Sequence, residues 1–175
     1  FRCAGWYIES SPKNDALVFL TRDEAKVYLH EAKELGTREI GITGGEPFLN
    51  PWLMGIIEDG LELGFEVLVL TNATRPLQRP RIQESLRALP QESRDRLTLR
   101  VSLDHHTPEI HEAERGANTF SPALDGLRWL QSEGFNVAVA GRREFAEDEV
   151  TARSAYDRLF KAEGIDLDIT DAKKL

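Results

Sequence analysis

Segments with helical patterning and segments with strand-like patterning alternate along the whole of this 175-residue chain. In the first kind, apolar residues recur at three- and four-residue spacing, and in the second they form short runs rich in branched residues. Such alternation predicts repeated α/β units rather than an all-helical or all-strand fold. Helices are expected over about 21–36, 51–64, 82–89, 121–134 and 148–163, and strands over 39–43, 66–70, 97–103, 136–140 and 165–169.

Five strands, each preceded by a helix, predict a parallel sheet with the helices packed outside it and right-handed crossovers. The chain opens with Phe1, Arg2 and Cys3 and continues into a loop that contains Gly, Ser and Pro. Such an opening is typical of the segment that follows a strand, so we expect the first strand of the fold to be absent. No linker divides the chain, which favours one domain over residues 1–175.

Composition and charge restrict the partners. With 41% hydrophobic and 30% charged residues, the chain can bury a core of its own. Its formal net charge of -8 argues against nucleic acid and anionic membrane surfaces, because both require clustered Lys and Arg. No apolar run approaches the roughly 20 residues of a membrane-spanning helix, and the single cysteine, Cys3, excludes an internal disulfide. A cytoplasmic protein with a small-molecule or protein partner is therefore expected.

Polar residues that directly follow the predicted strands form the candidate site. Ligands bind at the carboxyl ends of the strands both in barrels and in open parallel sheets, so these residues are expected to share one edge. They are Thr43, Gly44, Gly45, Glu46 and Pro47 after the first visible strand, Thr71 and Asn72 after the next, Ser102 and Asp104 after the third, and Arg142 after the fourth.

The turn from Gly44 to Pro47 is the most specific of these segments. The two glycines allow positive φ and close approach of the backbone to a ligand, Glu46 places a carboxylate beside main-chain groups, and Pro47 fixes the direction of exit. Such a turn suits a ligand that carries an ammonium group. A bare Gly-Gly pair would favour a merely tight strand-to-helix turn, but the full run over 41–51, GITGGEPFLNP, is far more particular.

This run resembles the GGEP segment of the radical S-adenosylmethionine (SAM) enzymes, which recognises the methionyl amino group of SAM. Further parts of the family pattern follow in order: a strand ending in Thr71-Asn72, then Ser-Leu-Asp at 102–104, then His111, then Arg115-Gly116. The resemblance implies a partial (β/α)6 TIM-like barrel of parallel strands with outer helices and with its first strand absent. It also implies that residues 1–175 are a radical SAM core domain, incomplete at its N-terminus.

The resemblance implies a role for each residue of the turn and of the next two strand ends. Gly44, Gly45 and Glu46 would hold the methionyl group of SAM, and Ser102 and Asn72 would hydrogen-bond its ribose or carboxylate. Pro47 and Thr71 belong to the same motifs and to the same implied site.

Two charged residues, Asp104 and Arg142, each have two possible roles. Asp104 would either contact SAM in the same way or organise its own loop. Arg142 suits the SAM carboxylate, because a guanidinium grips a carboxylate with two parallel hydrogen bonds; a salt bridge at the rim of the site explains it equally well.

The cluster loop of the family, C-x3-C-x2-C, is only partly present. Its three thiolates hold a [4Fe–4S] cluster and leave one iron free for SAM. Cys3 aligns with the second ligand, the first would precede Phe1, and the third falls on Trp6, whose indole is no thiolate. Either the chain is a truncated or altered form of a working enzyme, or it is a form that has lost its cluster. Without the resemblance, Cys3 is best interpreted as a structural thiol.

For the intact parent the resemblance implies SAM and a [4Fe–4S] cluster as cofactors and flavodoxin or ferredoxin as electron donor. SAM would be cleaved to methionine and a 5′-deoxyadenosyl radical, which abstracts hydrogen from a small-molecule or peptide substrate. The alternative from another class is a cluster-free SAM-binding or protein-interaction module.

A zinc hydrolase that uses His111 and Glu112 is the third hypothesis. Adjacent histidines such as His105 and His106 point in different directions on regular structure, and the sequence lacks a regular zinc spacing. These four residues and Asp104 are therefore interpreted as polar surface residues.

Overall fold

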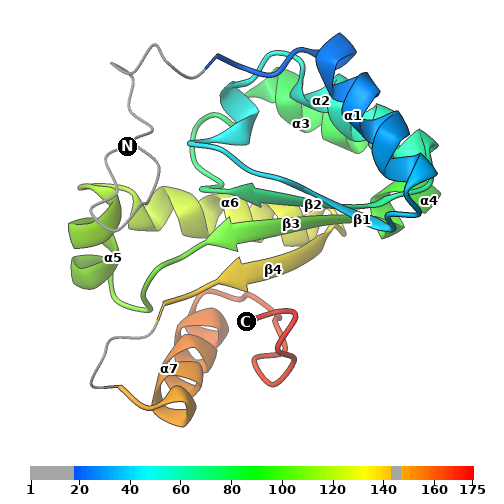
Figure 1. Ribbon diagram of the computed structural model, residues 1–175. Coiled ribbons are helices and arrows are strands. Elements are labelled where there is room, and N and C mark those ends of the chain that lie inside the picture. The colour runs from blue at the N-terminus through cyan, green and yellow to red at the C-terminus, as the bar shows by residue number, and fades with distance from the viewer. Residues whose placement is uncertain (1–17, 143–146) are drawn as a thin grey trace.

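The computed structural model describes residues 18–142 and 147–175 of the chain. Within that part, four strands form one sheet in the order β1-β2-β3-β4, and every neighbouring pair is parallel. Each crossover steps to the next strand, so the sheet grows in one direction (Figure 1). The predicted parallel sheet is confirmed. The strands are β1 (Glu39–Ile42), β2 (Glu66–Thr71), β3 (Leu97–Ser102) and β4 (Asn136–Ala140).

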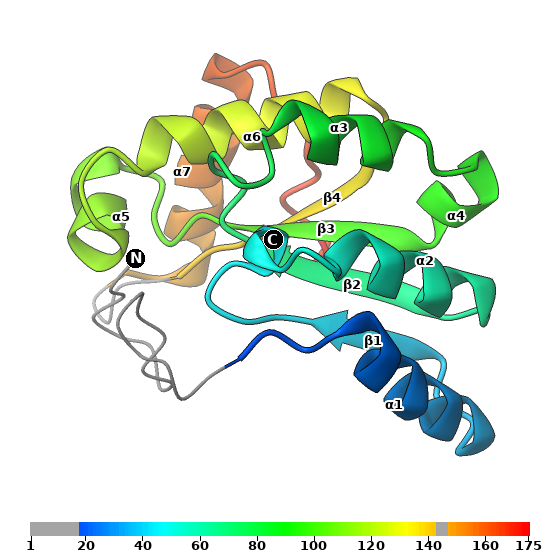
Figure 2. The same ribbon diagram turned by 90° about the horizontal axis from the view of Figure 1, so that it is seen from above.

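Helices connect the strands and cover the outside of the sheet, as predicted. Helix α1 packs beside α2 at the β1 end, and α6 packs against β3 and β4. Figure 2 shows α3 and α6 lying along the same side of the sheet. The helices are α1 (Arg22–Glu34), α2 (Leu53–Glu62), α3 (Pro80–Arg87), α4 (Gln91–Asp95), α5 (Pro108–Arg115), α6 (Phe120–Ser132) and α7 (Glu149–Ala162), with a 3-10 turn, η1 (Pro47–Leu49).

The hydrophobic core lies between the sheet and the helices that cover it. Val67 and Val69 of β2 are buried, and Leu68 between them is more exposed, so one face of this strand points into the core. β3 is buried in the same alternating way along most of its length. A rigid, well-packed sheet therefore supports the turns at its carboxyl edge.

The predicted fifth strand over 165–169 is wrong, because this segment is irregular in the structure. Its alternation of apolar and acidic residues suggested a half-buried strand. Instead, Asp168 Oδ1 accepts hydrogen bonds from the backbone N–H (2.8 Å) and the hydroxyl (2.7 Å) of Thr170, which closes a turn. Asp166 N donates to Gln131 Oε1 (2.9 Å) on α6. The chain meets β4 further on, where Val139 N donates to Lys174 O.

Two short helices, α4 and α5, were missing from the sequence prediction. The signal for α5 was present, since Pro108 occupies its first turn and Gly116 follows its last residue, Arg115. This helix matters because it carries His111 and Arg115 to the edge of the sheet. None of the helices in the described part of the chain is long and apolar enough to cross a membrane.

Candidate functional site

The described residues of the predicted site gather at the carboxyl edge of the sheet. Glu46 follows β1, Asn72 follows β2, Asp104 follows β3 and Arg142 follows β4. The proposed cluster ligand Cys3 lies outside the described residues, as does Trp6. The candidate site is therefore built from the four turns that leave the sheet at one end.

The carboxylate of Glu46 fixes the turn after β1 to the end of β2. Its Oε1 accepts hydrogen bonds from Phe48 N (3.1 Å) and Thr71 Oγ1 (2.8 Å), and its Oε2 accepts one from Asn72 N (2.8 Å). The Asn72 side chain in turn donates to Gly45 O (3.3 Å). Glu46 is buried, whereas Gly44 and Gly45 are exposed, so the hydrogen bonds hold the turn from inside and leave its outer surface free.

Burial raises the pKa of the Glu46 carboxyl, and the three hydrogen-bond donors and the charge of Arg115 oppose that rise. With three donors the carboxylate has its partners within the protein. What remains open to a ligand is the main chain of the turn. Beside Gly44, an added Cβ would meet no atom within 4 Å.

Arg115, at the end of α5, joins the turns after β2 and β3. Its Nε and Nη2 donate to Asp104 Oδ2 (2.7 Å) and Oδ1 (2.9 Å), and its Nη1 donates to Asn72 Oδ1 (2.5 Å). All three residues are buried. The planar guanidinium suits such a forked arrangement, which a lysine could not reproduce. In the sequence, Arg115 was only a matching position of a motif, and no role was predicted for it.

Asp104 also contacts the loop after β4. Its backbone carbonyl accepts a hydrogen bond from Arg142 N (2.9 Å), and its Oδ1 lies 3.3 Å from Arg142 Nε. Arg142 is exposed, and its Nη1 lies 3.9 Å from Glu114 Oε2. In this geometry Asp104 organises the loops around it, and the Arg142 side chain makes ion pairs at the rim of the site.

A small hollow lies beside the Arg115 fork, lined by Asn72, Thr74, Ser102, His111, Arg115 and Thr119. His111 Nδ1 accepts a hydrogen bond from Asp104 N (3.2 Å), so the neutral ring carries its proton on Nε2. His111 Nε2 and Thr74 Oγ1 are buried and have no hydrogen-bond partner among the described residues. A hollow with two such atoms is where ordered water is expected.

The buried ring of His111 predicts a pH effect on stability. Burial, together with the charge of Arg115, lowers its pKa to about 4. Between that value and the ordinary 6.5, the unfolded chain binds the proton more readily, so stability falls as the pH falls. We expect this residue to lower the free energy of unfolding by on the order of 2 kcal/mol between pH 7 and pH 4. His111→Asn should flatten that part of the profile in urea unfolding at stepped pH, and an unchanged slope would contradict the assignment.

The hydrolase hypothesis does not fit the geometry. His111 faces the hollow, whereas Glu112 Oε1 accepts a hydrogen bond from Phe120 N (3.3 Å). In residues 18–142 and 147–175, the one group of potential metal ligands that converges is His105, His106 and Glu147. Asp104, His105 and His111 are 4%, 5% and 1% exposed, so their interpretation as surface residues is wrong.

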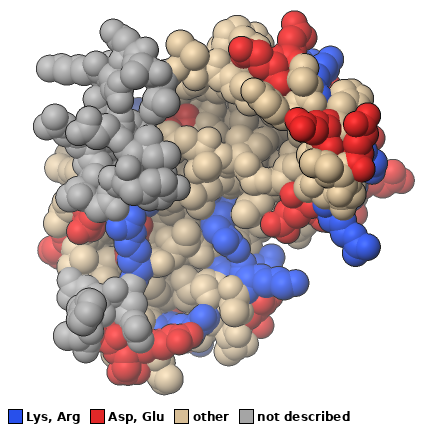
Figure 3. Space-filling view, viewed as in Figure 1, with Lys and Arg blue, Asp and Glu red and all other residues tan. Residues whose placement is uncertain are grey.

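Charges on the face of the molecule seen in Figure 3 are mixed. Basic side chains lie there in separate groups, with acidic side chains around them. The described part of this face therefore lacks the continuous basic surface that a nucleic-acid backbone requires.

These features define an α/β domain whose polar turns share the carboxyl edge of a parallel sheet, the edge at which open parallel barrels bind their ligands. A family model, the radical SAM superfamily, matches residues 3–153. The AdoMet-dependent heme synthase of Methanosarcina barkeri is 33% identical over 134 residues, 76% of this chain and 35% of that protein. The antilisterial bacteriocin subtilosin biosynthesis protein AlbA of Bacillus subtilis is 31% identical over 140 residues, 79% of this chain and 30% of that protein. The chain belongs to the radical SAM superfamily of enzymes, and it spans about a third of the length of these relatives.

Solved structures share the fold of this chain. Streptococcus suis SuiB bound to S-adenosylmethionine superposes with a TM-score of 0.69 at 15% identity, over 94% of this chain and 34% of that one. SuiB bound to the precursor peptide SuiA superposes with a TM-score of 0.64 at 15% identity, over 86% of this chain and 32% of that one. The predicted partial TIM-like barrel is thus confirmed.

Proposed function

We propose that residues 1–175 form the SAM-binding core domain of a radical SAM enzyme. The observation that carries the proposal is the exposed Gly44-Gly45 turn, fixed from inside by the buried Glu46 carboxylate at the carboxyl edge of the sheet. An exposed, rigid turn offers main-chain carbonyl groups that can accept hydrogen bonds from an ammonium without prior rearrangement. The methionyl end of SAM carries such a group.

The other predicted residues divide between binding and support. Asn72, Thr71 and Glu46 make hydrogen bonds with one another or with the turn, and this supports a positioning role for them. Pro47 begins η1 and is buried behind the turn. Asp104 pairs with both Arg115 and Arg142. Arg115 is buried and Arg142 is exposed, so Arg142 is the better candidate for the SAM carboxylate. Ser102 lines the hollow near the same edge.

A [4Fe–4S] cluster of the family type does not fit the donors of this chain. Three thiolates are required, and residues 1–175 contain one cysteine, Cys3, with Trp6 at the position of the third ligand. We therefore assign to this chain the binding and orientation of SAM, and no electron-transfer step. In a form with a complete ligand set, the electron donor is proposed to be a flavodoxin or ferredoxin.

The proposed substrate is a small molecule or a peptide. The structural likeness to SuiB, which has been solved with its precursor peptide SuiA, supports the peptide. The chain spans about a third of the length of these relatives, and the choice between the two substrate classes is not assigned to any of its residues.

Calorimetric titration of the 175-residue chain with SAM tests the proposal. We expect saturable binding of one SAM per chain, and at least about tenfold weaker binding for Gly44→Val, because the new side chain fills the open space beside the turn. Glu39→Ala is the matched control: it removes an exposed side chain at the opposite end of the same strand and should leave the Kd unchanged. Equal Kd values for all three proteins, or no binding by the native sequence, would refute SAM binding at this turn.

A cluster-free SAM-binding or interaction module is the second candidate, favoured by the incomplete thiolate set. Anaerobic iron and sulfide assays separate the two. About four irons per chain in a variant that carries Trp6→Cys and an added cysteine before Phe1, but not in the native sequence, would identify a disabled part of a radical enzyme. SAM binding with no iron in either version would establish the cluster-free module.

A further inference from the structure

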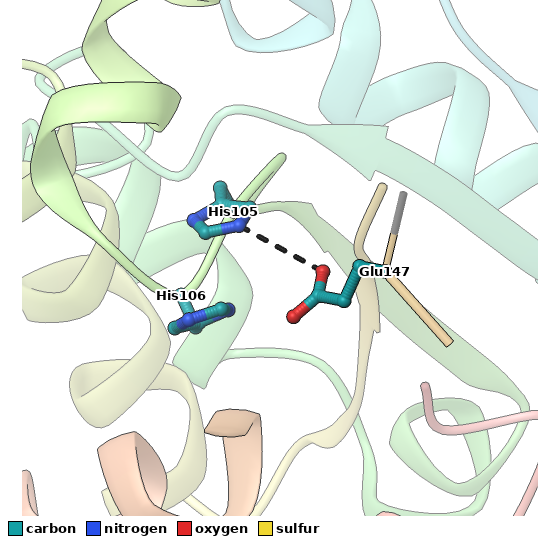
Figure 4. A group of neighbouring side chains, drawn as sticks. All are labelled: His105, His106 and Glu147. Carbon is teal, nitrogen blue, oxygen red and sulfur yellow. Dashed lines mark ion pairs between the residues drawn. The ribbon is translucent and has the colours of Figure 1, made fainter. Parts of the chain in front are cut away.

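Three side chains outside the proposed SAM turn converge at the carboxyl edge of β3 and β4. His105 and His106 lie in the loop after β3, and Glu147 precedes α7, so segments about 40 residues apart meet (Figure 4). One potential ligand atom from each residue lies within 4.8 Å of the other two. His105 Nε2 and Glu147 Oε2 are 3.9 Å apart.

Two atoms of this group are buried without a partner. His106 Nδ1 and Glu147 Oε2 are inaccessible to solvent and have no hydrogen-bond partner among the described residues. Leaving a buried carboxylate oxygen and a buried ring nitrogen without a hydrogen bond is unfavourable, and each such group in a native structure calls for an occupant or a proton. Because the two atoms are closed to water, the occupant must be small.

We propose that His105, His106 and Glu147 form a binding site for one divalent transition-metal ion, with zinc as the best match. Two imidazoles and one carboxylate are a donor set that zinc accepts, with a fourth position left for water or another ligand. The site shares no residue with the Gly44-Gly45 turn, and it does not rest on the proposed function.

The spacing is close to what such an ion needs. Three atoms within 4.8 Å of one another have a common centre no more than about 2.8 Å from each, whereas zinc binds nitrogen and oxygen ligands at about 2.0–2.2 Å. Each ligand atom therefore has to move inward by about 0.8 Å at most, which side-chain rotation supplies.

The hydrogen bonds of Thr107 determine which ring nitrogen of His105 is free to bind the metal ion. Its backbone N–H (3.0 Å) and its Oγ1 (2.9 Å) both lie against His105 Nδ1. Without metal, the N–H donates to Nδ1 and the ring proton sits on Nε2, facing Glu147. With metal on Nε2, the ring proton moves to Nδ1 and is donated to Thr107 Oγ1, an outer-shell bond of the kind that ligand histidines usually make. Metal binding therefore breaks the hydrogen bond from Thr107 N–H to His105 Nδ1. This loss lowers the metal affinity by about tenfold relative to a site that keeps all its hydrogen bonds.

Titration of the metal-stripped 175-residue chain with Co²⁺, followed by Zn²⁺ displacement, tests the site without SAM or iron. We expect one Co²⁺ per chain with the visible absorption of a tetrahedral N/O site, and a Zn²⁺-dependent rise in Tm, since binding to the native state alone stabilises it. Glu147→Gln and His106→Gln should each weaken binding by at least about tenfold. His30→Ala, on the exposed surface of α1, is the matched control and should bind like the native chain.

Cys3→Ser identifies the ligands independently of folding. If the site is the one proposed, this variant keeps the Co²⁺ spectrum and the affinity unchanged, and the native chain shows no thiolate-to-cobalt band. Three results would each overturn the proposal: loss of the spectrum in Cys3→Ser, native affinity in Glu147→Gln, or no binding by the native chain. The last result would mean that Thr107 N–H keeps the proton of His105 on Nε2. Far-UV circular dichroism of each variant confirms that it is folded.

Discussion

Replacing Arg115 with Met should lower the free energy of unfolding by about 4 kcal/mol, because it breaks a buried ion pair on one side only. The substitution keeps much of the side-chain volume but leaves the Asp104 carboxylate and the Asn72 carbonyl oxygen without their donors. Arg142, whose Nε lies 3.3 Å from Asp104 Oδ1, compensates in part. Urea unfolding at pH 7 measures the loss.

Arg87→Met is the matched control for this experiment. Arg87 pairs with Glu133 (2.6 Å), but its side chain is 47% exposed, so the pair is screened by water and should contribute far less to stability than the buried fork. The double variant Asp104→Asn, Arg115→Met should recover part of the loss, since no unpaired charge stays buried. Similar losses for Arg115→Met and Arg87→Met would show that the buried fork contributes no more than a surface pair.

Most of the fold follows from local sequence. The helical periods and the short apolar runs were sufficient for a parallel sheet in sequential order, because each strand contacts the next one along the chain. The segment over 165–169 misled because its alternation is real, but its polar groups are bonded to a turn and to a helix and not to a neighbouring strand. Thr170 bonds to Asp168, and the side chain of Gln131 binds the backbone of Asp166, and neither contact can be read from a period.

The position of the site could be predicted from the sequence, but most of its hydrogen bonds could not. Residues that follow parallel strands meet at one edge whatever their identity, so Glu46, Asn72 and Asp104 could be placed together from topology. The fork of Arg115 could not, because it joins Asn72 and Asp104 at separations of 43 and 11 residues from a helix that was missed. Glu147 joins the histidines for a similar reason, across the whole of α6 and β4.

Gly126→Ala should be as damaging as the loss of the fork, although it adds a single methyl group. Helix α6 crosses the turn after β2 so closely that a Cβ at position 126 would lie 1.9 Å from Ala73 O and 2.8 Å from Ala73 Cβ. Both atoms belong to Ala73, a buried residue whose backbone φ is already +53°. They cannot rotate away as the end of a long side chain can. We expect a loss of about 3 kcal/mol or more in the free energy of unfolding, measured by urea titration.

Gly41→Ala separates the effect of this contact from the general effect of replacing a glycine. At Gly41 of β1 an added Cβ meets no atom within 4 Å, so stability should stay within about 0.5 kcal/mol of the native value. Ala73 follows Asn72 directly, so any shift of α6 in Gly126→Ala also displaces the residue that links Gly45 to Arg115. SAM binding should therefore weaken in Gly126→Ala and persist in Gly41→Ala. Native stability in Gly126→Ala would mean that α6 withdraws from the turn at no cost, and that close packing does not fix the site.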